Sequence, residues 1–174
     1  MINKYSFINI YEHKKKNSRL SSQILYGEKF TILKKYKDWY KIKTDYDEYV
    51  GFIRKKKFEK FTNKPTHKVS SLKANVFSKP YRGSKIKMKL SFASLLQIKE
   101  SKNNFLNFEN YWIHNSDVVP ISYKEKIFNK ITIFKDVKYK WGGKKFDGID
   151  CSGLVQLFYK FNNLYCPRDT GPQF

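Results

Sequence analysis

Cys151 is the residue whose type and position point most directly to chemistry. It stands directly after Asp150, a residue type that caps helix N-termini. Apolar residues then recur at the spacing of an amphipathic helix, at Leu154, Val155, Leu157, Phe158 and Phe161. A thiol in the first turn of a helix lies near free backbone N–H groups and the positive end of the helix dipole, which favour the thiolate. Cys151 is therefore a candidate nucleophile, and the alternative is a small buried apolar side chain.

Two further motifs flank this cysteine. Tyr139-Lys140-Trp141-Gly142-Gly143 precedes it, and Pro167-Arg168-Asp169-Thr170 with Gln173 follows it. Together with Gly148-Ile149-Asp150-Cys151-Ser152-Gly153, they resemble the NlpC/p60 family of cysteine peptidases. In that family a Y-x-W-G-G stretch precedes a D-C-S-G turn, and a P-R-x-[ST]-x-x-Q element follows. The resemblance implies that 122–174 form the N-terminal part of a papain-like peptidase domain.

The resemblance also implies an activity. Family members hydrolyse the amide between γ-D-glutamate and a diamino acid in bacterial cell-wall peptides, during wall turnover or recycling. Cys151 would attack the carbonyl carbon as thiolate and form an acyl-enzyme, with its own backbone N–H helping to hold the oxyanion. In members that require a free N-terminal L-Ala, the pocket for the peptide's amino end is lined by residues that match Tyr139, Asp150, Ser152 and Arg168.

Two of these pocket residues have an alternative role. Asp150 also suits a helix cap. The positive side chain of Arg168 would more naturally order its loop or meet a carboxylate than contact an amine.

The sequence offers no histidine downstream of Cys151. A peptidase of this kind needs a general base, which the family supplies as a histidine C-terminal to the nucleophile. His13, His67 and His114 all precede Cys151, and we expect neither His67 nor His114 to act as the base. We therefore expect a truncated version of a longer enzyme that ends at Phe174 inside its catalytic domain, with little or no hydrolysis. We also expect the apolar face of the helix at 151–161 to be exposed and prone to aggregate.

Short alternating segments precede the cysteine block. Apolar alternation within 24–33, 39–43 and 49–53, with turn residues between, predicts the strands of a small β-barrel. A second set of β-like pieces at 68–121 follows a predicted linker at 61–67. Both sets resemble the bacterial SH3-like barrels that often precede this peptidase domain. The predicted fold class is α+β: two small SH3-like β-barrels at 1–63 and 64–121, then the N-terminal half of a papain-like domain at 122–174.

Two local expectations concern the stretch before the nucleophile. Ile127, Phe128, Ile131 and Phe134 have the spacing of one face of a short helix. Trp141 is expected in the core rather than in the site.

The chain is strongly basic. Among 174 residues, 36 Lys and Arg face 15 Asp and Glu, a formal net charge of +21. A basic patch is typical of nucleic-acid binding, but here Lys and Asn are spread over the whole length. We interpret the charge as mainly compositional and expect no nucleic-acid partner. Because 40% of residues are hydrophobic, a wholly disordered polycation is excluded.

The chain has only two cysteines, Cys151 and Cys166. A disulfide framework and a tetrahedral cysteine zinc site are therefore excluded, and no cofactor or metal is predicted.

The expected function is therefore a cysteine-type endopeptidase acting on murein peptide, with a non-catalytic module that binds cell-wall peptide or an anionic polymer as the alternative. No run of about 18 apolar residues is present, so no membrane span is predicted. Without a signal segment the expected location is the cytoplasm, and it becomes periplasmic or wall-associated if the true start lies upstream.

Overall fold

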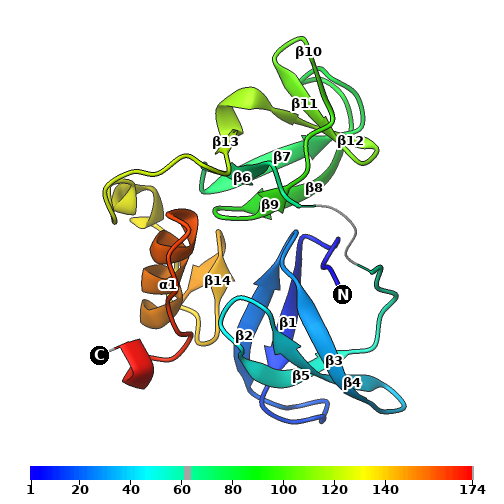
Figure 1. The fold of residues 1–174 in the computed structure, drawn as a ribbon, viewed down its shortest axis with the longest axis vertical. Helices are drawn as coiled ribbons and strands as arrows, with labels where there is room; N and C mark the ends of the chain where they lie inside the picture. The colour runs from blue at the N-terminus through cyan, green and yellow to red at the C-terminus, as the bar shows by residue number, and fades with distance from the viewer. Residues whose placement is uncertain (61–63, 174) are drawn as a thin grey trace.

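The computed structural model describes residues 1–60 and 64–173, so three residues of the predicted linker lie outside it. We name three consecutive parts: the N-terminal β unit (1–60), the central β unit (64–121) and the C-terminal segment (122–173). Figure 1 shows the two β units stacked along the long axis, with the C-terminal segment beside both of them. The fold is mostly β, with a single α-helix among the described residues.

The N-terminal β unit is a five-stranded antiparallel sheet of order β2-β1-β5-β4-β3. Its strands are β1 Phe7–Tyr11, β2 Leu20–Leu25, β3 Phe30–Lys35, β4 Trp39–Thr44 and β5 Val50–Arg54. The three predicted strand regions are confirmed, because each alternates apolar residues that point into one core. That core consists of Ile8, Ile10, Ile24, Phe30, Ile42 and Ile53.

The central β unit contains two small sheets, of order β10-β11-β12-β7-β8 and β13-β6-β9. Its strands are β6 His67–Val69, β7 Lys73–Phe77, β8 Ile86–Ser91, β9 Leu95–Leu96, β10 Glu100–Lys102, β11 Phe105–Phe108, β12 Tyr111–His114 and β13 Val118–Pro120, and the 3-10 turn η1 spans Asn115–Asp117. The pairing is open at the sheet edges in both β units, so the two predicted closed barrels are not confirmed. At one such edge, β2 contacts a short strand of the C-terminal segment that belongs to a separate sheet.

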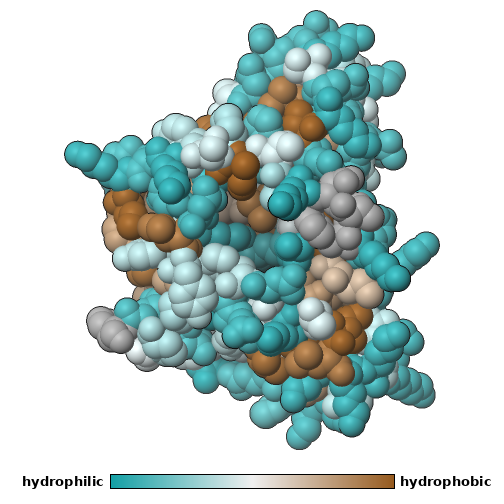
Figure 2. Space-filling view, in the orientation of Figure 1, coloured by the Kyte–Doolittle hydropathy of each residue, from teal (hydrophilic) through white to brown (hydrophobic). Residues whose placement is uncertain are grey.

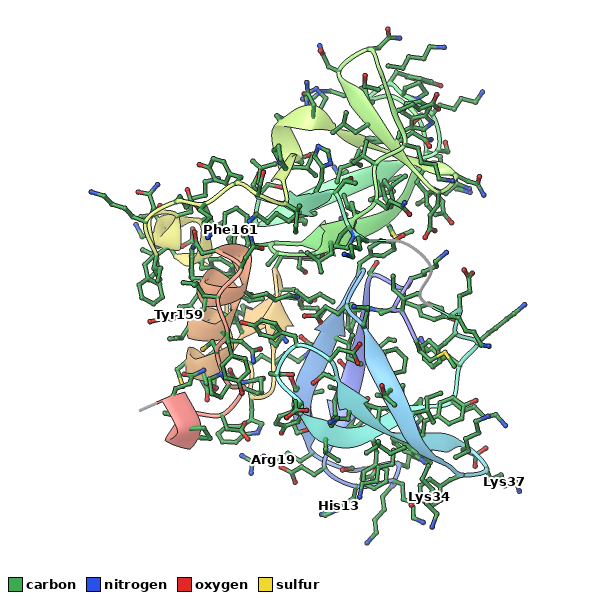
Figure 3. All side chains as sticks on the ribbon, in the orientation of Figure 1. His13, Arg19, Lys34, Lys37, Tyr159 and Phe161 are labelled. Carbon is green, nitrogen blue, oxygen red and sulfur yellow. The ribbon has the colours of Figure 1, made fainter. Side chains whose placement is uncertain are left out.

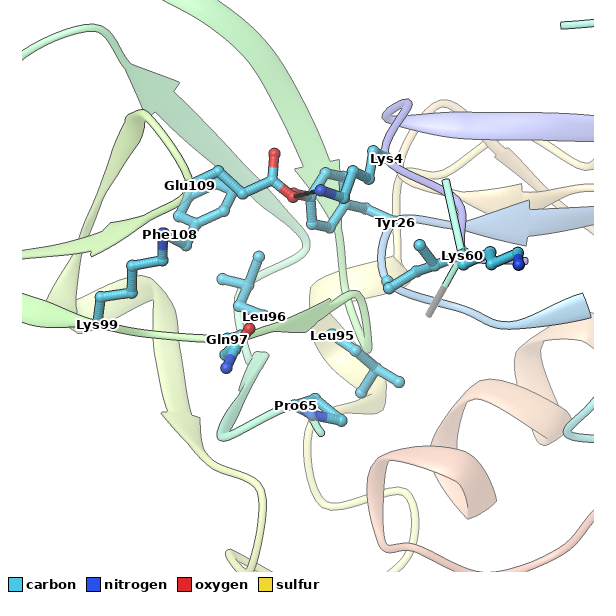
Figure 4. Close-up of a pocket in the computed structure, with 12 residues that line it drawn as sticks. Lys4, Tyr26, Lys60, Pro65, Leu95, Leu96, Gln97, Lys99, Phe108 and Glu109 are labelled. Atoms are coloured by element: carbon cyan, nitrogen blue, oxygen red, sulfur yellow. Dashed lines mark ion pairs between the residues drawn. The ribbon is translucent and has the colours of Figure 1, made fainter. Parts of the chain in front are cut away.

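A pocket of about 250 Å³ lies where the two β units meet. Figure 4 shows the Lys4 ammonium of the N-terminal unit paired with Glu109 of the central unit, at 3.0 Å. Tyr26, Leu95 and Phe108 form part of the apolar wall. No residue of the Cys151 turn lines this pocket, so it belongs to the junction of the β units.

The C-terminal segment contains η2 Ile131–Phe134, β14 Lys144–Lys145, β15 Gly148–Ile149, α1 Cys151–Phe161 and η3 Gly171–Gln173. The short helix predicted over 127–134 is wrong in its first half, because Phe128 has a φ of 67° and a left-handed residue interrupts helical hydrogen bonding. Only a 3-10 turn forms, and it buries Phe134. No helix among the described residues is long and apolar enough to cross a membrane.

The apolar face of α1 is covered by both β units. Leu157, Phe158 and Phe161 are buried in a cluster that includes Leu25 of β2 and Phe92 of the central unit. The Phe92 and Phe161 rings stack with centroids 4.5 Å apart. The expectation that this face is exposed and aggregation-prone is therefore wrong. Burial of each large apolar side chain contributes about 1.5–3 kcal/mol, which fixes the helix between the two units.

Apolar side chains do reach the surface elsewhere on the C-terminal segment. Figure 2 shows brown residues over the region where Figure 1 draws the η2 turn. Phe128 and Ile131 are exposed there, and Leu164 and Tyr165 are exposed after the helix. The apolar surface of this segment is thus contributed by the loops around α1 rather than by its core face.

Lys68 of β6 completes the C-terminal end of α1. Its side chain is 1% exposed, and its ammonium donates to the carbonyl oxygens of Ile121 (3.2 Å), Tyr123 (2.5 Å) and Phe161. The last carbonyls of a helix lack intrahelical partners and carry the negative end of the dipole. A buried lysine from a distant strand thereby satisfies three backbone carbonyls in two separate segments, 121–123 and the end of α1.

We predict that Lys68→Met lowers the free energy of unfolding by about 2–4 kcal/mol, because buried carbonyls lose a charged donor. Urea unfolding followed by tryptophan fluorescence measures this change. Lys85→Met, at an exposed lysine, is the matched control and should leave the midpoint unchanged. Equal midpoints for the two variants would contradict the capping role.

Candidate active site around Cys151

The turn that carries Cys151 begins α1. Asp150 has an extended backbone, with φ −99° and ψ 172°, and its Oδ1 accepts a hydrogen bond from the Gly153 N–H at 2.7 Å. The predicted helix cap is therefore confirmed. Cys151 is exposed and free of any disulfide, so the alternative of a buried apolar cysteine is wrong. Its thiol lies at the positive end of a capped helix and is accessible to solvent.

Arg168 holds the capping residue in place. The guanidinium donates to both oxygens of Asp150, at 3.1 and 2.7 Å, and to Ser152 Oγ at 2.8 Å. Its Nε donates to Ser22 Oγ of β2 at 2.9 Å. Arg168 is only 3% exposed, and Asp150 and Ser152 are also buried. The predicted contact of Arg168 with a carboxylate is therefore confirmed, and that carboxylate belongs to Asp150.

The Y-x-W-G-G motif forms the neighbouring turn. The Gly142 N–H donates to Asp150 Oδ2 at 2.7 Å, which ties this turn to the cap. Tyr139 is 66% exposed and Trp141 is 52% exposed. The expectation that Trp141 lies in the core is wrong, because the Arg19 guanidinium covers its ring from outside, 3.8 Å from the centroid.

Strand β2 supports both turns from the N-terminal unit. Gly142 has a φ of 70°, and a Cβ there would lie 2.8 Å from the Leu20 carbonyl oxygen, so only glycine allows this approach. Gln23 Oε1 accepts from the Lys144 backbone N–H at 2.7 Å. Sequence reasoning missed Ser22 and Gln23, because no local pattern links β2 to residues more than a hundred positions away.

A buried charged network holds the last turn of α1. Glu28 accepts from the Lys160 ammonium and from the Leu25 N–H, and the Lys144 ammonium lies 3.9 Å from the same carboxylate. Burial alone would raise the pKa of Glu28, but Lys144 and Lys160 outweigh it and hold that pKa below its ordinary value. The carboxylate therefore stays charged between two ammonium groups.

Asp47 and Cys166 complete this network. Gln156 of α1 donates to Asp47 Oδ2 at 2.7 Å and to the Cys166 carbonyl oxygen at 3.1 Å. Burial, and then the nearby Asp47 carboxylate, raise the pKa of the Cys166 thiol. Cys166 is thus a buried thiol that favours its protonated form, whereas Cys151 is exposed.

The two histidines considered as bases lie in the central β unit and bond within it. His67 pairs with Thr66 at 3.0 Å, and His114 pairs with Ser116 and Arg82. Burial lowers the pKa of His67. Within residues 1–60 and 64–173, no group of three His, Cys, Asp or Glu side chains is placed to hold a metal ion.

Residues 10–58 match the family described as the bacterial dipeptidyl-peptidase SH3 domain, and residues 136–174 match the NlpC/P60 family. The resemblance to the NlpC/P60 family is confirmed. A crystal structure of an NlpC/P60 family protein from Bacillus cereus ATCC 10987 superposes with a TM-score of 0.85 at 19% identity, covering 99% of this chain and 75% of that one. It shows that the two chains share a fold.

Two curated relatives are named gamma-D-glutamyl-L-lysine dipeptidyl-peptidase. The Bacillus subtilis (strain 168) protein is 29% identical over 174 residues, which cover 88% of this chain and 57% of the relative. The Bacillus cereus (strain ATCC 10987 / NRS 248) protein is 25% identical over 182 residues, which cover 90% and 54%. The chain thus spans about half the length of these two relatives.

We predict that a maleimide reagent near pH 7 labels one thiol per native chain, at Cys151. The Cys151 thiol is exposed, whereas the Cys166 thiol is buried and protonated. Intact mass spectrometry counts the adducts. Cys166→Ala should keep the single adduct and Cys151→Ala should lose it, while unfolding in guanidinium should expose two thiols. Labelling of Cys166 in the native chain would refute this assignment.

A second prediction concerns pH. Because the folded pKa of Glu28 lies below its ordinary value of 4.5, its contribution to stability is present above that value and is lost as pH falls through the folded pKa. The stability of the parent chain should therefore decline as pH falls below about 4.5 and toward the lower folded pKa of Glu28. Glu28→Gln should be less stable at pH 7 and show a shallower decline. Chemical unfolding across this range measures both slopes, with Glu100→Gln, an exposed carboxylate, as control. Equal slopes in all three chains would exclude the role of Glu28.

Proposed function

We propose that Cys151 is the nucleophile of a cysteine peptidase that cleaves the bond between γ-D-glutamate and a diamino acid in peptidoglycan peptides. The observation that carries the proposal is an exposed thiol in the first turn of α1, behind a cap that buried Arg168 fixes. The names of the two Bacillus relatives support the choice of bond. The predicted domain division at 1–63, 64–121 and 122–174 belongs to the same proposal.

The proposed reaction uses few groups of this chain. The Cys151 thiolate attacks the γ-carbonyl carbon, and the carbonyl electron pair moves to oxygen, where the Cys151 backbone N–H donates a hydrogen bond. The C–N bond then breaks, the diamino acid leaves as a protonated amine, and water hydrolyses the thioester. The family resemblance implies that a histidine C-terminal to Cys151 accepts the thiol proton. We therefore propose that 1–174 alone has little or no hydrolytic activity.

Tyr139, Asp150, Ser152 and Arg168 remain the proposed pocket for the amino end of the peptide. Asp150, Ser152 and Arg168 are buried and hydrogen-bonded to one another. Their role in this proposal is therefore to form the wall of the pocket rather than to bind the peptide directly. Tyr139 is exposed and free to touch substrate. Asp169, the residue after Arg168, adds an exposed carboxylate beside these residues. An ammonium group of the peptide suits that carboxylate.

The alternative is a binding module without catalysis. One specific feature favours it. His67 and His114 form their hydrogen bonds within the central unit and not at the Cys151 turn, so neither is placed to act as a base for Cys151. Both proposals predict binding of a murein peptide. Only the peptidase predicts that an added C-terminal part restores turnover.

We predict that the chain alone releases no more than traces of L-Ala-γ-D-Glu from L-Ala-γ-D-Glu-L-Lys. A hybrid that carries the C-terminal part of the Bacillus subtilis relative after residue 174 should cleave the tripeptide, because it supplies the expected base. Product release is measured by liquid chromatography. Cys151→Ala should abolish the turnover of the hybrid, and Cys166→Ala should retain it. Turnover that survives Cys151→Ala would exclude Cys151 as the nucleophile, and robust turnover by residues 1–174 alone would contradict the proposed need for a base supplied from outside them.

A further inference from the structure

Arg19 is an exposed cation fixed beside the Cys151 turn. It is the last residue before β2, and its guanidinium carbon lies 3.8 Å from the centroid of the half-exposed Trp141 ring. Figure 3 labels Arg19 at the edge of the N-terminal unit that faces the C-terminal segment. Among the described residues, no carboxylate lies within ion-pair distance of its guanidinium. A guanidinium stacked on an aromatic face keeps its planar N–H edge free for an anion.

The backbone next to Arg19 is locked to the nucleophile. Leu20 packs against Gly142, whose close approach leaves no room for a side chain. Gly142 in turn donates its N–H to Asp150, the residue before Cys151. A short chain of contacts therefore fixes Arg19 relative to the thiol, although the two residues are far apart in sequence.

Three buried cations near this turn are already paired with carboxylates. Arg168 is buried and makes a two-fold contact with Asp150. Lys144 and Lys160 share the Glu28 carboxylate. Arg19 differs from all three, because it is exposed, stacked on Trp141 and without a carboxylate partner among the described residues.

The proposed substrate carries a matching charge. In a γ-linked glutamyl peptide the side-chain carbonyl is the one attacked, so the α-carboxylate of the same residue stays free. We propose that Arg19 binds this α-carboxylate through a bidentate contact and makes the site selective for γ-D-glutamyl peptides over their α-amide counterparts. This inference rests on the proposed function and adds a specificity residue to it. An α-amide would place its N–H₂ donors against the guanidinium donors and leave both unpaired.

The test uses the chain as it is and a covalent peptide probe. In L-Ala-γ-D-Glu chloromethyl ketone, the thiolate sulfur displaces chloride, so a C–S bond forms and the C–Cl bond breaks. The α-amide form of the same probe is the comparison. We expect the free acid to label Cys151 about tenfold faster than the amide, as intact mass spectrometry records with time. Arg19→Gln should bring this ratio to about one, and Arg19→Lys should retain only part of it, because an ammonium lacks the planar fork.

Arg54→Gln is the matched control. Arg54 also stacks on a tryptophan, 4.1 Å from the Trp39 ring, and its loss changes the net charge equally. It should keep the parental acid-to-amide ratio. Labelling by iodoacetamide should be the same in all variants, which shows that the thiol itself is intact.

Two outcomes overturn the inference in distinguishable ways. If both peptide probes label Cys151 faster than a chloromethyl ketone without a peptide, but at equal rates, then Arg19 does not select the carboxylate and the proposed function stands. If neither peptide probe is faster than that simple ketone, the peptide specificity in the proposed function fails, and the inference fails with it.

Discussion

The buried contact between Asp150 and Arg168 is the constraint on which the candidate site depends. Both side chains are withdrawn from water, which costs several kcal/mol per ion unless each charge is paired and hydrogen-bonded. Here the pairing is two-fold, and Gly142, Gly153, Ser152 and Ser22 occupy remaining donor and acceptor positions. Because the pair is stable only with all these partners present, it fixes the cap, the glycine turn and β2 as one arrangement.

The helix that begins at Cys151, α1, is fixed at its middle and its C-terminal end as well. Gln156 and Lys160 bind carboxylates of the N-terminal unit, and Lys68 of the central unit binds the carbonyl of Phe161. The apolar cluster around Phe92 fills the space between these polar contacts. Each part of the chain therefore contributes to the position of one thiol. This explains why the N-terminal unit presents one of its edge strands to the C-terminal segment, since β2 satisfies groups there that no other described residue reaches.

The sequence predicted the features that depend on neighbouring residues. The cap at Asp150, the helix after Cys151 and the strands around Ile42 follow from local spacing and residue type, and the structure confirms them. Features set by distant contacts were missed. Glu28 and Lys160 are 132 positions apart, and nothing near either residue indicates the other. The position of Trp141 was mispredicted for the same reason. An aromatic residue is expected in the core, and the contact with Arg19 of the N-terminal unit is not visible in the local sequence.

The basic composition takes on a different meaning once burial is known. An even spread of lysine along a chain favours a compositional origin, and exposed lysines fit that interpretation. Lys68, Lys144 and Lys160 do not, because each is buried and lies against a specific acceptor. An exposed lysine tolerates replacement by any polar residue, whereas a buried one leaves carbonyls or a carboxylate unpaired. Net charge therefore describes the surface of this protein, while a few of its cations hold the interfaces that orient Cys151.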